Sequence, residues 1–258
     1  MARLSAKPGP RGTQLGQLYQ SGSLKLVFPR QTDLGLCGVL VNTAGGATGG
    51  DRFDVRAEVV ADATLTLTTQ AAERAYKAKG TDPARLNTRL RVRDGGTLHW
   101  LPQETILFEG CKAERSLDVD LAATGAALIA ETLIFGRAAM GETLRNADFR
   151  DRILIRRAGR PILLEAAQYT GDVQAQLARR FTGNGAVAVT IVALAAPGAA
   201  SALTTVRAML PDTGGASAIS DDLLILRLLA PDSHLLRQSL VPILTHLTKT
   251  DLPRPWMI

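Results

Sequence analysis

Apolar and polar residues alternate with a period of two along most of this 258-residue chain up to about residue 170. The segment FDVRAEVV (53–60) places apolar residues on one side and charged residues on the other. The same pattern recurs in TLTLTT (64–69), RLNTRLRVR (85–93), RSLDVDL (115–121) and RILIRR (152–157). Such alternation is typical of strands with one buried and one solvated face. The sequence therefore predicts a mainly β protein.

These strands recur in a larger unit of strand, small-residue turn and second strand. Three copies place a leucine at the start of the second strand, at Leu65, Leu98 and Leu128, and a weaker fourth copy does so at Leu163. A period of about 30 residues predicts stacked β-layers, similar to a β-helix or solenoid, in which each layer covers its neighbour. A plain antiparallel meander with hairpins of similar length is the alternative.

The pattern changes after residue 170. Residues 183–197 contain a buried strand, 199–210 have helical spacing, GASAIS and DLLILRLLA form two short strands, and 231–249 carry the best helical stripe. Asp232 or Ser233 is suited to cap that last helix, and Pro242 should bend or divide it. We expect a flexible N-terminus (1–12), a β-rich stacked-layer domain (13–170) and an α+β portion with about two helices (171–258) packed against it.

A glycine-rich stretch, AGGATGGD (44–51), resembles a phosphate loop in composition. A phosphate loop needs a following Lys and a helix whose N-terminus faces the anion, whereas Asp51 and a strand follow here. The glycines instead indicate positive φ and close backbone approach between strands. Asp51 is then either an Asx-turn residue or a ligand for a cation.

Catalytic and tight metal sites are not indicated by the residue pattern. The three histidines and the cysteines Cys37 and Cys111 have no ligand spacing, and GxSxG and HExxH are absent. Carboxylates do stand at strand ends. Glu131 and Glu165 hold similar places in the repeat, so stacked layers would bring them together. They would then either hold a divalent cation weakly or pair with arginines.

Charge and composition limit the partners. The net charge is +6, but the arginines are scattered singly on strand faces, which favours solvated surface over nucleic-acid binding. Two cysteines without a framework indicate a reducing cytoplasm. The longest apolar run, at 186–198, is shorter than the ~20 residues that a membrane span needs, and no secretory signal is visible.

Several motifs follow one another along the chain: NTAGGATGGDRFDV, TLTTQAAERAYKA, LHWLPQETILFEG, IAETLIFGRAAMGET, LLEAAQ and a C-terminal LLAPDSHLLRQSL…LPRPW. Their distinctive residues are Gly45, Gly46, Gly49, Gly50, Pro102, Gln103, Glu104, Gly136, Arg137, Gly141 and Glu142. In combination they resemble the UreD family of urease accessory proteins, called UreH in some bacteria, from about residue 12 to 256. The Ala-rich stretch 183–205 matches no motif of that family.

The resemblance implies a mainly β fold and a non-enzymatic role in urease maturation. It implies a scaffold that binds the urease apoprotein and UreF, reaches the GTPase UreG through UreF, and assists nickel delivery. No tightly bound cofactor is implied, only nickel in transit. By position, Asp51, Glu131 and Glu165 correspond to acidic residues proposed to line an internal path in the family.

Two other classes remain as alternatives. A β-solenoid protein that binds or cleaves carbohydrate would need paired carboxylates and stacking aromatics, but aromatics make up only 4% of the residues. A nucleic-acid-binding β domain would need aromatics interleaved with its basic strands.

Overall fold

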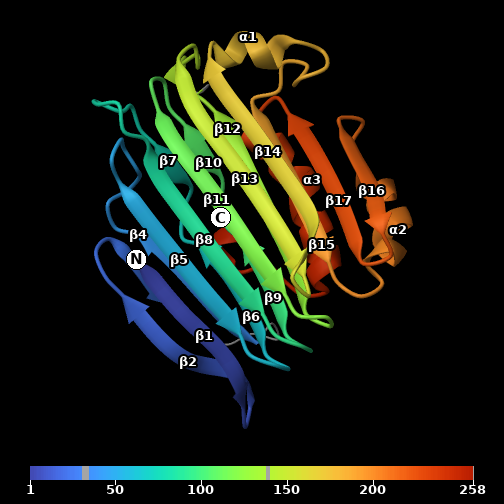
Figure 1. Ribbon diagram of the computed structural model, residues 1–258. Coiled ribbons are helices and arrows are strands. Elements are labelled where there is room, and N and C mark those ends of the chain that lie inside the picture. Colours follow the sequence, from blue (N-terminus) through green and yellow to red (C-terminus); the bar gives the residue numbers. More distant parts are fainter. Residues whose placement is uncertain (31–34, 138–139, 258) are drawn as a thin grey trace.

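The computed structural model describes residues 1–30, 35–137 and 140–257 and consists of two β-sheets that face each other (Figure 1). The seven-stranded sheet contains, in spatial order, β14 (Arg160–Gly171), β13 (Ala147–Arg157), β11 (Lys112–Leu121), β8 (Ala84–Val92), β5 (Arg52–Val59), β1 (Ala2–Gly9) and β2 (Gly12–Gln20). The ten-stranded sheet contains β16 (Gly214–Ser220), β17 (Leu223–Ala230), β15 (Ala188–Ala195), β12 (Ala126–Phe135), β9 (Thr97–Leu101), β6 (Thr64–Thr69), β4 (Leu36–Asn42) and β3 (Leu24–Val27). In the same sheet β10 (Thr105–Leu107) pairs with β12, and β7 (Glu73–Ala75) pairs with β10.

The chain passes from one sheet to the other and back, so that successive strands of each sheet are parallel. β5, β8, β11 and β13 form the parallel centre of one sheet, and β4, β6, β9 and β12 that of the other. The predicted solenoid-like stack is therefore confirmed, because an antiparallel meander would have no parallel centre. Leucine and valine from both inner faces form the main core between the sheets.

The repeat is less regular than the sequence suggested. Leu65 pairs in register with Leu98, but Leu98 pairs with Ala127, one residue before the expected Leu128. The fourth copy is wrong: Leu163 lies on β14, which turns back antiparallel to β13 in the seven-stranded sheet. The two-residue turn at Ala158 and Gly159, both with positive φ, makes a hairpin there instead of a crossover.

Antiparallel strands lie at both ends of the stack. β2 pairs with β1 and β3 with β4 at one end, while β14 closes the seven-stranded sheet at the other. The segment 1–12, expected to be flexible, contains β1, which pairs parallel with β5 because its alternate residues Ala2, Leu4 and Ala6 are buried in the core.

The C-terminal part continues the ten-stranded sheet. β15 pairs antiparallel with β12 over Ala127–Ile134, and the hairpin β16–β17 follows. Helices α2 (Leu203–Met209), preceded by the 3-10 turn η2 (Ala199–Ala202), and α3 (Ser233–Thr248) pack on the outer face of this sheet (Figure 1). A third, short helix, α1 (Val173–Ala178), was not expected.

The last helix has the predicted cap and stripe. The Asp232 side chain accepts a hydrogen bond from Leu235 N (2.7 Å), and Leu236, Leu240, Ile243 and Leu244 are buried. Pro242 does not divide α3, which runs unbroken through it. After the helix, the 3-10 turn η3 (Arg254–Met257) holds Trp256, which donates a hydrogen bond to Leu101 O and anchors the C-terminal segment on β9. Among the residues described, no helix has the length and apolarity that crossing a bilayer requires.

Candidate functional site

A cluster of charged side chains lies buried between the two sheets. The Arg115 guanidinium on β11 contacts Glu131 on β12 (2.5 Å) and forms a two-point contact with Asp151 on β13 (2.6 and 2.9 Å). All three side chains are at most 10% exposed. The Trp100 indole N–H donates to the second oxygen of Glu131 at 2.7 Å. The cluster therefore bridges the sheets through charge-assisted hydrogen bonds where leucine and valine would otherwise pack.

Strand register explains how these residues come together. Arg115 and Asp151 are partners on adjacent parallel strands, so their side chains leave the same inner face of the seven-stranded sheet. On β12, Glu131 alternates with the inward-facing Ala127 and Ile129. The inner surface of both sheets thus changes from apolar to charged at one level of the stack.

Burial and pairing shift the acid–base properties of the cluster. Burial raises the pKa of Glu131, and the attraction of Arg115 and the Trp100 hydrogen bond offset only part of that effect. Burial alone would lower the pKa of Arg115, but Asp151 and Glu131 outweigh it and raise that pKa. Burial, and then repulsion by Asp151, raise the pKa of the nearby Tyr169 phenol. The cluster therefore contains two carboxyl groups, Glu131 and Asp151, and one guanidinium group, Arg115.

Two cavities meet at this cluster. The larger, of about 320 Å³, is lined by Arg115, Glu131, Asp151, Glu165, Tyr169 and Arg227 among others. The smaller, of about 70 Å³, lies on the other side and is lined by Glu73, Asn87, Trp100, Gln103 and Thr105 as well as by Arg115 and Glu131. The Arg115–Glu131 pair is therefore the wall that the two cavities share.

The predicted residue Glu165 lines the larger cavity together with Glu131. Its carboxylate contacts Arg227 of β17 at 2.6 Å, and both side chains are partly exposed. The repeat does not bring the two glutamates together, since Glu165 is on an antiparallel strand of the opposite sheet. They share one cavity because β14 and β12 enclose it from the two sides.

The predicted residue Asp51 lies outside both cavities, at the end of the glycine loop. Its carboxylate accepts a hydrogen bond from Thr48 N (2.8 Å), and its own N–H donates to Thr48 O (3.0 Å). Asp51 therefore closes a turn, but the bond runs three residues back and differs from an Asx turn, in which the side chain bonds the N–H two residues on. Gly45 and Gly50 have positive φ, and a Cβ at Gly46 would lie 2.8 Å from Arg74 O. The glycines therefore allow the loop to pack closely against β7, and the predicted close approach of the backbone is confirmed.

Glu73 of β7 connects that loop with the interior and was missed by sequence reasoning. It lines the smaller cavity and accepts hydrogen bonds from the Asn42 side chain at 3.1 and 3.2 Å. Burial raises the pKa of Glu73, and repulsion from Asp51 adds to that effect. Carboxylates thus occur at the glycine loop, in the middle of the interior and in the larger cavity.

Other motif residues hold strands and helix together. Pro102, Gln103 and Glu104 are buried after β9, where Arg237 of α3 donates to Gln103 Oε1 (2.9 Å) and pairs with Glu104 (3.5 Å). Arg137 pairs with Glu142 and lies over the Phe108 ring, and Gly136 and Gly141 provide positive φ on either side of that turn. Residues 138–139 of this motif lie outside the described residues.

No group of three or more His, Cys, Asp or Glu side chains is arranged to hold a metal ion within residues 1–30, 35–137 and 140–257. His99 lies in β9, where its Nδ1 is 3.1 Å from the Thr66 hydroxyl oxygen, and burial lowers its pKa to about 4. The carboxylates of Glu131, Asp151 and Glu165 are already engaged by arginines. That of Glu73 accepts hydrogen bonds from Asn42.

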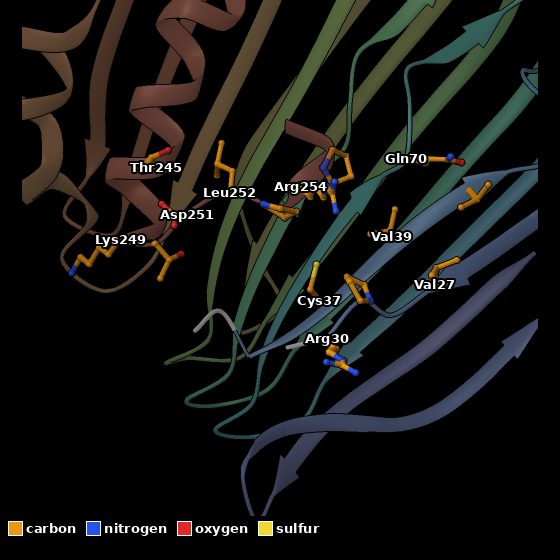
Figure 2. A pocket seen from close by; sticks show the side chains of 15 residues that line it. Val27, Arg30, Cys37, Val39, Gln70, Thr245, Lys249, Asp251, Leu252 and Arg254 are labelled. Atoms are coloured by element: carbon orange, nitrogen blue, oxygen red, sulfur yellow. The ribbon is translucent and has the colours of Figure 1, made fainter. Parts of the chain in front are cut away.

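A separate groove of about 1150 Å³ lies on the outer face of the ten-stranded sheet (Figure 2). The side chains of Cys37, Val39 and Val41 on β4 form one wall. The segment 249–255 that follows α3 forms the other. The lining is mostly apolar; among the residues that the structure describes, Arg30, Lys249 and Arg254 are its basic members and Asp251 is its acidic one.

Comparison with known proteins identifies the family. The model of the family described as "UreD urease accessory protein" matches residues 1–257. This chain belongs to the UreD family of urease accessory proteins. The chain is 48% identical over 244 residues to a urease accessory protein UreD from Ruegeria pomeroyi, covering 95% of both chains. It is 43% identical over 257 residues to a UreD from Roseobacter denitrificans, covering 100% of this chain and 94% of the relative.

A more distant UreD, from a Rhodopseudomonas palustris strain, is 43% identical over 247 residues and is covered to 88% of its length. Because the match extends over nearly the whole of each chain, the urease accessory role belongs to the complete fold described above, and the resemblance drawn from the motifs is confirmed.

Proposed function

We propose that this chain is a non-catalytic scaffold of urease maturation, which binds the urease apoprotein and UreF in the cytoplasm, reaches UreG through UreF, and lets nickel pass between its sheets. Membership of the UreD family supports the maturation role. The observation that carries the nickel path is the pair of inter-sheet cavities that meet at Arg115 and Glu131.

The path runs from the glycine loop to the larger cavity. Asp51 and Glu73 lie at its first end, Glu131 and Asp151 in the middle, and Glu165 in the larger cavity. Oxygen ligands without thiolate or imidazole bind a borderline cation such as Ni²⁺ weakly. Weak sites suit transit, because a complete ligand set would retain the ion.

Arg115 gives the middle of the path two states. When no metal ion is bound, the Arg115 guanidinium pairs with both Glu131 and Asp151 and neutralises part of their charge in the buried interior. A divalent cation that takes Glu131 leaves Arg115 its two contacts with Asp151. The passing ion and the guanidinium therefore compete for one carboxylate, and neither buried carboxylate is left without a cation.

The double variant E131Q/E165Q tests this path. In E131Q, Arg115 still pairs with Asp151, so the fold should persist. In cells that express the urease operon, we expect the variant to co-purify with UreF as the unmodified protein does, while urease isolated from these cells holds less nickel per active site. E114Q/D118N, on the outer face of the seven-stranded sheet, is the matched control and should leave the nickel content unchanged.

Normal nickel content in urease made with E131Q/E165Q would overturn the path. Loss of UreF from the variant would overturn it as well, because the carboxylates would then act through partner binding.

The groove beside α3 is our candidate contact for UreF. Its apolar walls and three basic residues fit an amphipathic segment with acidic residues at its edge. The variant V39D/V41D places two charges on one wall, and we expect loss of UreF with retention of the fold. Retention of UreF would refute the assignment, and loss of the urease apoprotein alone would assign the groove to urease instead.

The carbohydrate alternative gains no support from this interior. A glycosidase holds two carboxylates across an open groove. Here Glu131 and Asp151 are both bound by one guanidinium between the sheets.

A further inference from the structure

Three arginines stand in one row on the outer face of the seven-stranded sheet. Arg3 of β1 is in register with Arg56 of β5, which is in register with Arg89 of β8. Neighbouring strands lie about 4.8 Å apart, so the row is about 10 Å long. All three side chains are exposed. Tyr19 of β2, which is 56% exposed, is the register partner of Arg3 and extends the row to the sheet edge.

None of the three arginines has a hydrogen bond or ion pair with another residue that the structure describes. The nearest carboxylate in the row is Asp118 of β11, the register partner of Arg89. It contacts Arg152 and Arg156 on its other side, at 3.3 and 3.6 Å. Elsewhere on this face charges are paired, as in Arg93 with Glu58 and Arg85 with Glu114. The row of Arg3, Arg56 and Arg89 has no such partner among the described residues.

An uncompensated row works against the fold. Like charges directly opposite each other on neighbouring strands destabilise a sheet, whereas threonine or glutamine would keep the face wet without repulsion. The row also lines a shallow hollow of about 330 Å³, together with Arg91, Glu58 and Asp120. The three guanidinium groups point to a ligand that supplies the missing negative charge.

We propose that this arginine row binds an acidic segment of a protein partner. Guanidinium groups bind carboxylates through two parallel hydrogen bonds, and arginine and tyrosine are the residues enriched at the energetic centres of protein interfaces. Glu58 and Asp120 in the same hollow, and the acidic residues of β11 beside it, would repel a continuous phosphate backbone. A protein surface of mixed charge fits this pattern, and the inference holds whether or not nickel passes between the sheets.

The test compares two double variants of the full-length chain with equal charge change on the same sheet face. R56Q/R89Q removes unpaired arginines, and R150Q/R152Q removes arginines that pair with Glu114 and Asp118. The probe is a fluorescein-labelled ten-residue peptide in which glutamates alternate with serines, and its binding is followed by fluorescence anisotropy at low and moderate salt. A ten-nucleotide oligothymidylate, with its continuous phosphate backbone, is the second probe.

We expect R56Q/R89Q to weaken peptide binding by about fivefold or more at low salt, from two exposed ion pairs, and R150Q/R152Q to change it by less than about twofold. We expect Y19A to weaken it as well. An equal loss in both double variants would show that only net charge matters and would overturn the proposal. Tighter binding of the oligonucleotide than of the peptide would overturn it in favour of nucleic acid.

Discussion

Replacing Arg115 by methionine removes the cation from the interior and leaves two carboxylates without it. Glu131 and Asp151 are 5% and 10% exposed, so neither gains much solvation when the guanidinium is lost. At an effective dielectric constant of ~20, a unit charge pair at ~4 Å interacts by about 4 kcal/mol. Breaking a buried pair from one side costs about 3–5 kcal/mol. That cost is a large part of the ~5–15 kcal/mol by which a domain is stable.

Urea unfolding followed by tryptophan fluorescence measures this loss, because Trp100, one of the two tryptophans, donates a hydrogen bond to Glu131 in the cluster. With a slope near ~3 kcal/mol/M, the R115M midpoint should fall by about 1–2 M. R152M is the control: Arg152 pairs with Asp118 on the outer face with 45% and 25% exposure, and its loss should cost less than about 1 kcal/mol. The triple variant R115M/E131L/D151L should recover most of the stability, since an apolar cluster needs no cation.

The pH dependence gives a second check on R115M. Burial already raises the pKa of Glu131, and loss of Arg115 raises it further. The folded variant then binds protons more readily than the unfolded chain, so its stability should increase as the pH falls through the raised pKa of Glu131 toward the ordinary pKa of a glutamate. An R115M midpoint equal to that of R152M, or a triple variant no more stable than R115M, would refute the argument that the interior is held by paired charge.

Further predictions concern single positions. Burial lowers the pKa of His99 from 6.5 to about 4, so the folded state loses stability as the pH falls from 6.5 to 4, by up to roughly 3 kcal/mol. H99Q should flatten this part of the curve of stability against pH, and an unchanged slope would contradict the prediction. G46A should cost about 1–3 kcal/mol in urea unfolding because the new Cβ would lie 2.8 Å from a carbonyl oxygen, whereas G80A, with open space around it, should be neutral; equal costs would exclude close approach as the reason. D232A removes the cap of α3 and should cost about 1 kcal/mol in thermal unfolding, which D232S should restore; no loss in D232A would show that the cap is dispensable.

The period-two alternation and the ~30-residue spacing were sufficient to predict the stacked sheets. Both patterns are local, and parallel stacking repeats them in space with little change. The extra copy at Leu163 failed because the turn at Ala158–Gly159 makes a hairpin, and turn geometry outweighs a leucine position in choosing between crossover and return.

The charged cluster had a signal in the same alternation that was not used. Arg115 stands two residues before Leu117 and Asp151 two before Ile153, so both occupy the apolar side of their strands. The interpretation of the arginines as solvated strand surface overlooked that position for Arg115, and Asp151 was not considered. Their pairing with Glu131 across the two sheets was not predictable, because register within a strand does not tell which residue of the opposite sheet lies above it.

The antiparallel hairpins at both ends of the stack limit the addition of further coils or of a second molecule to the sheets. A parallel array with free edges can in principle accept another coil or another molecule, as fibrils do. Here β2 and β3 at one end and β14 at the other run antiparallel to their neighbours. The parallel pattern of backbone hydrogen-bond donors and acceptors therefore ends at these strands. The number of coils, and with it the distance from the glycine loop to the larger cavity, is a fixed dimension of the molecule.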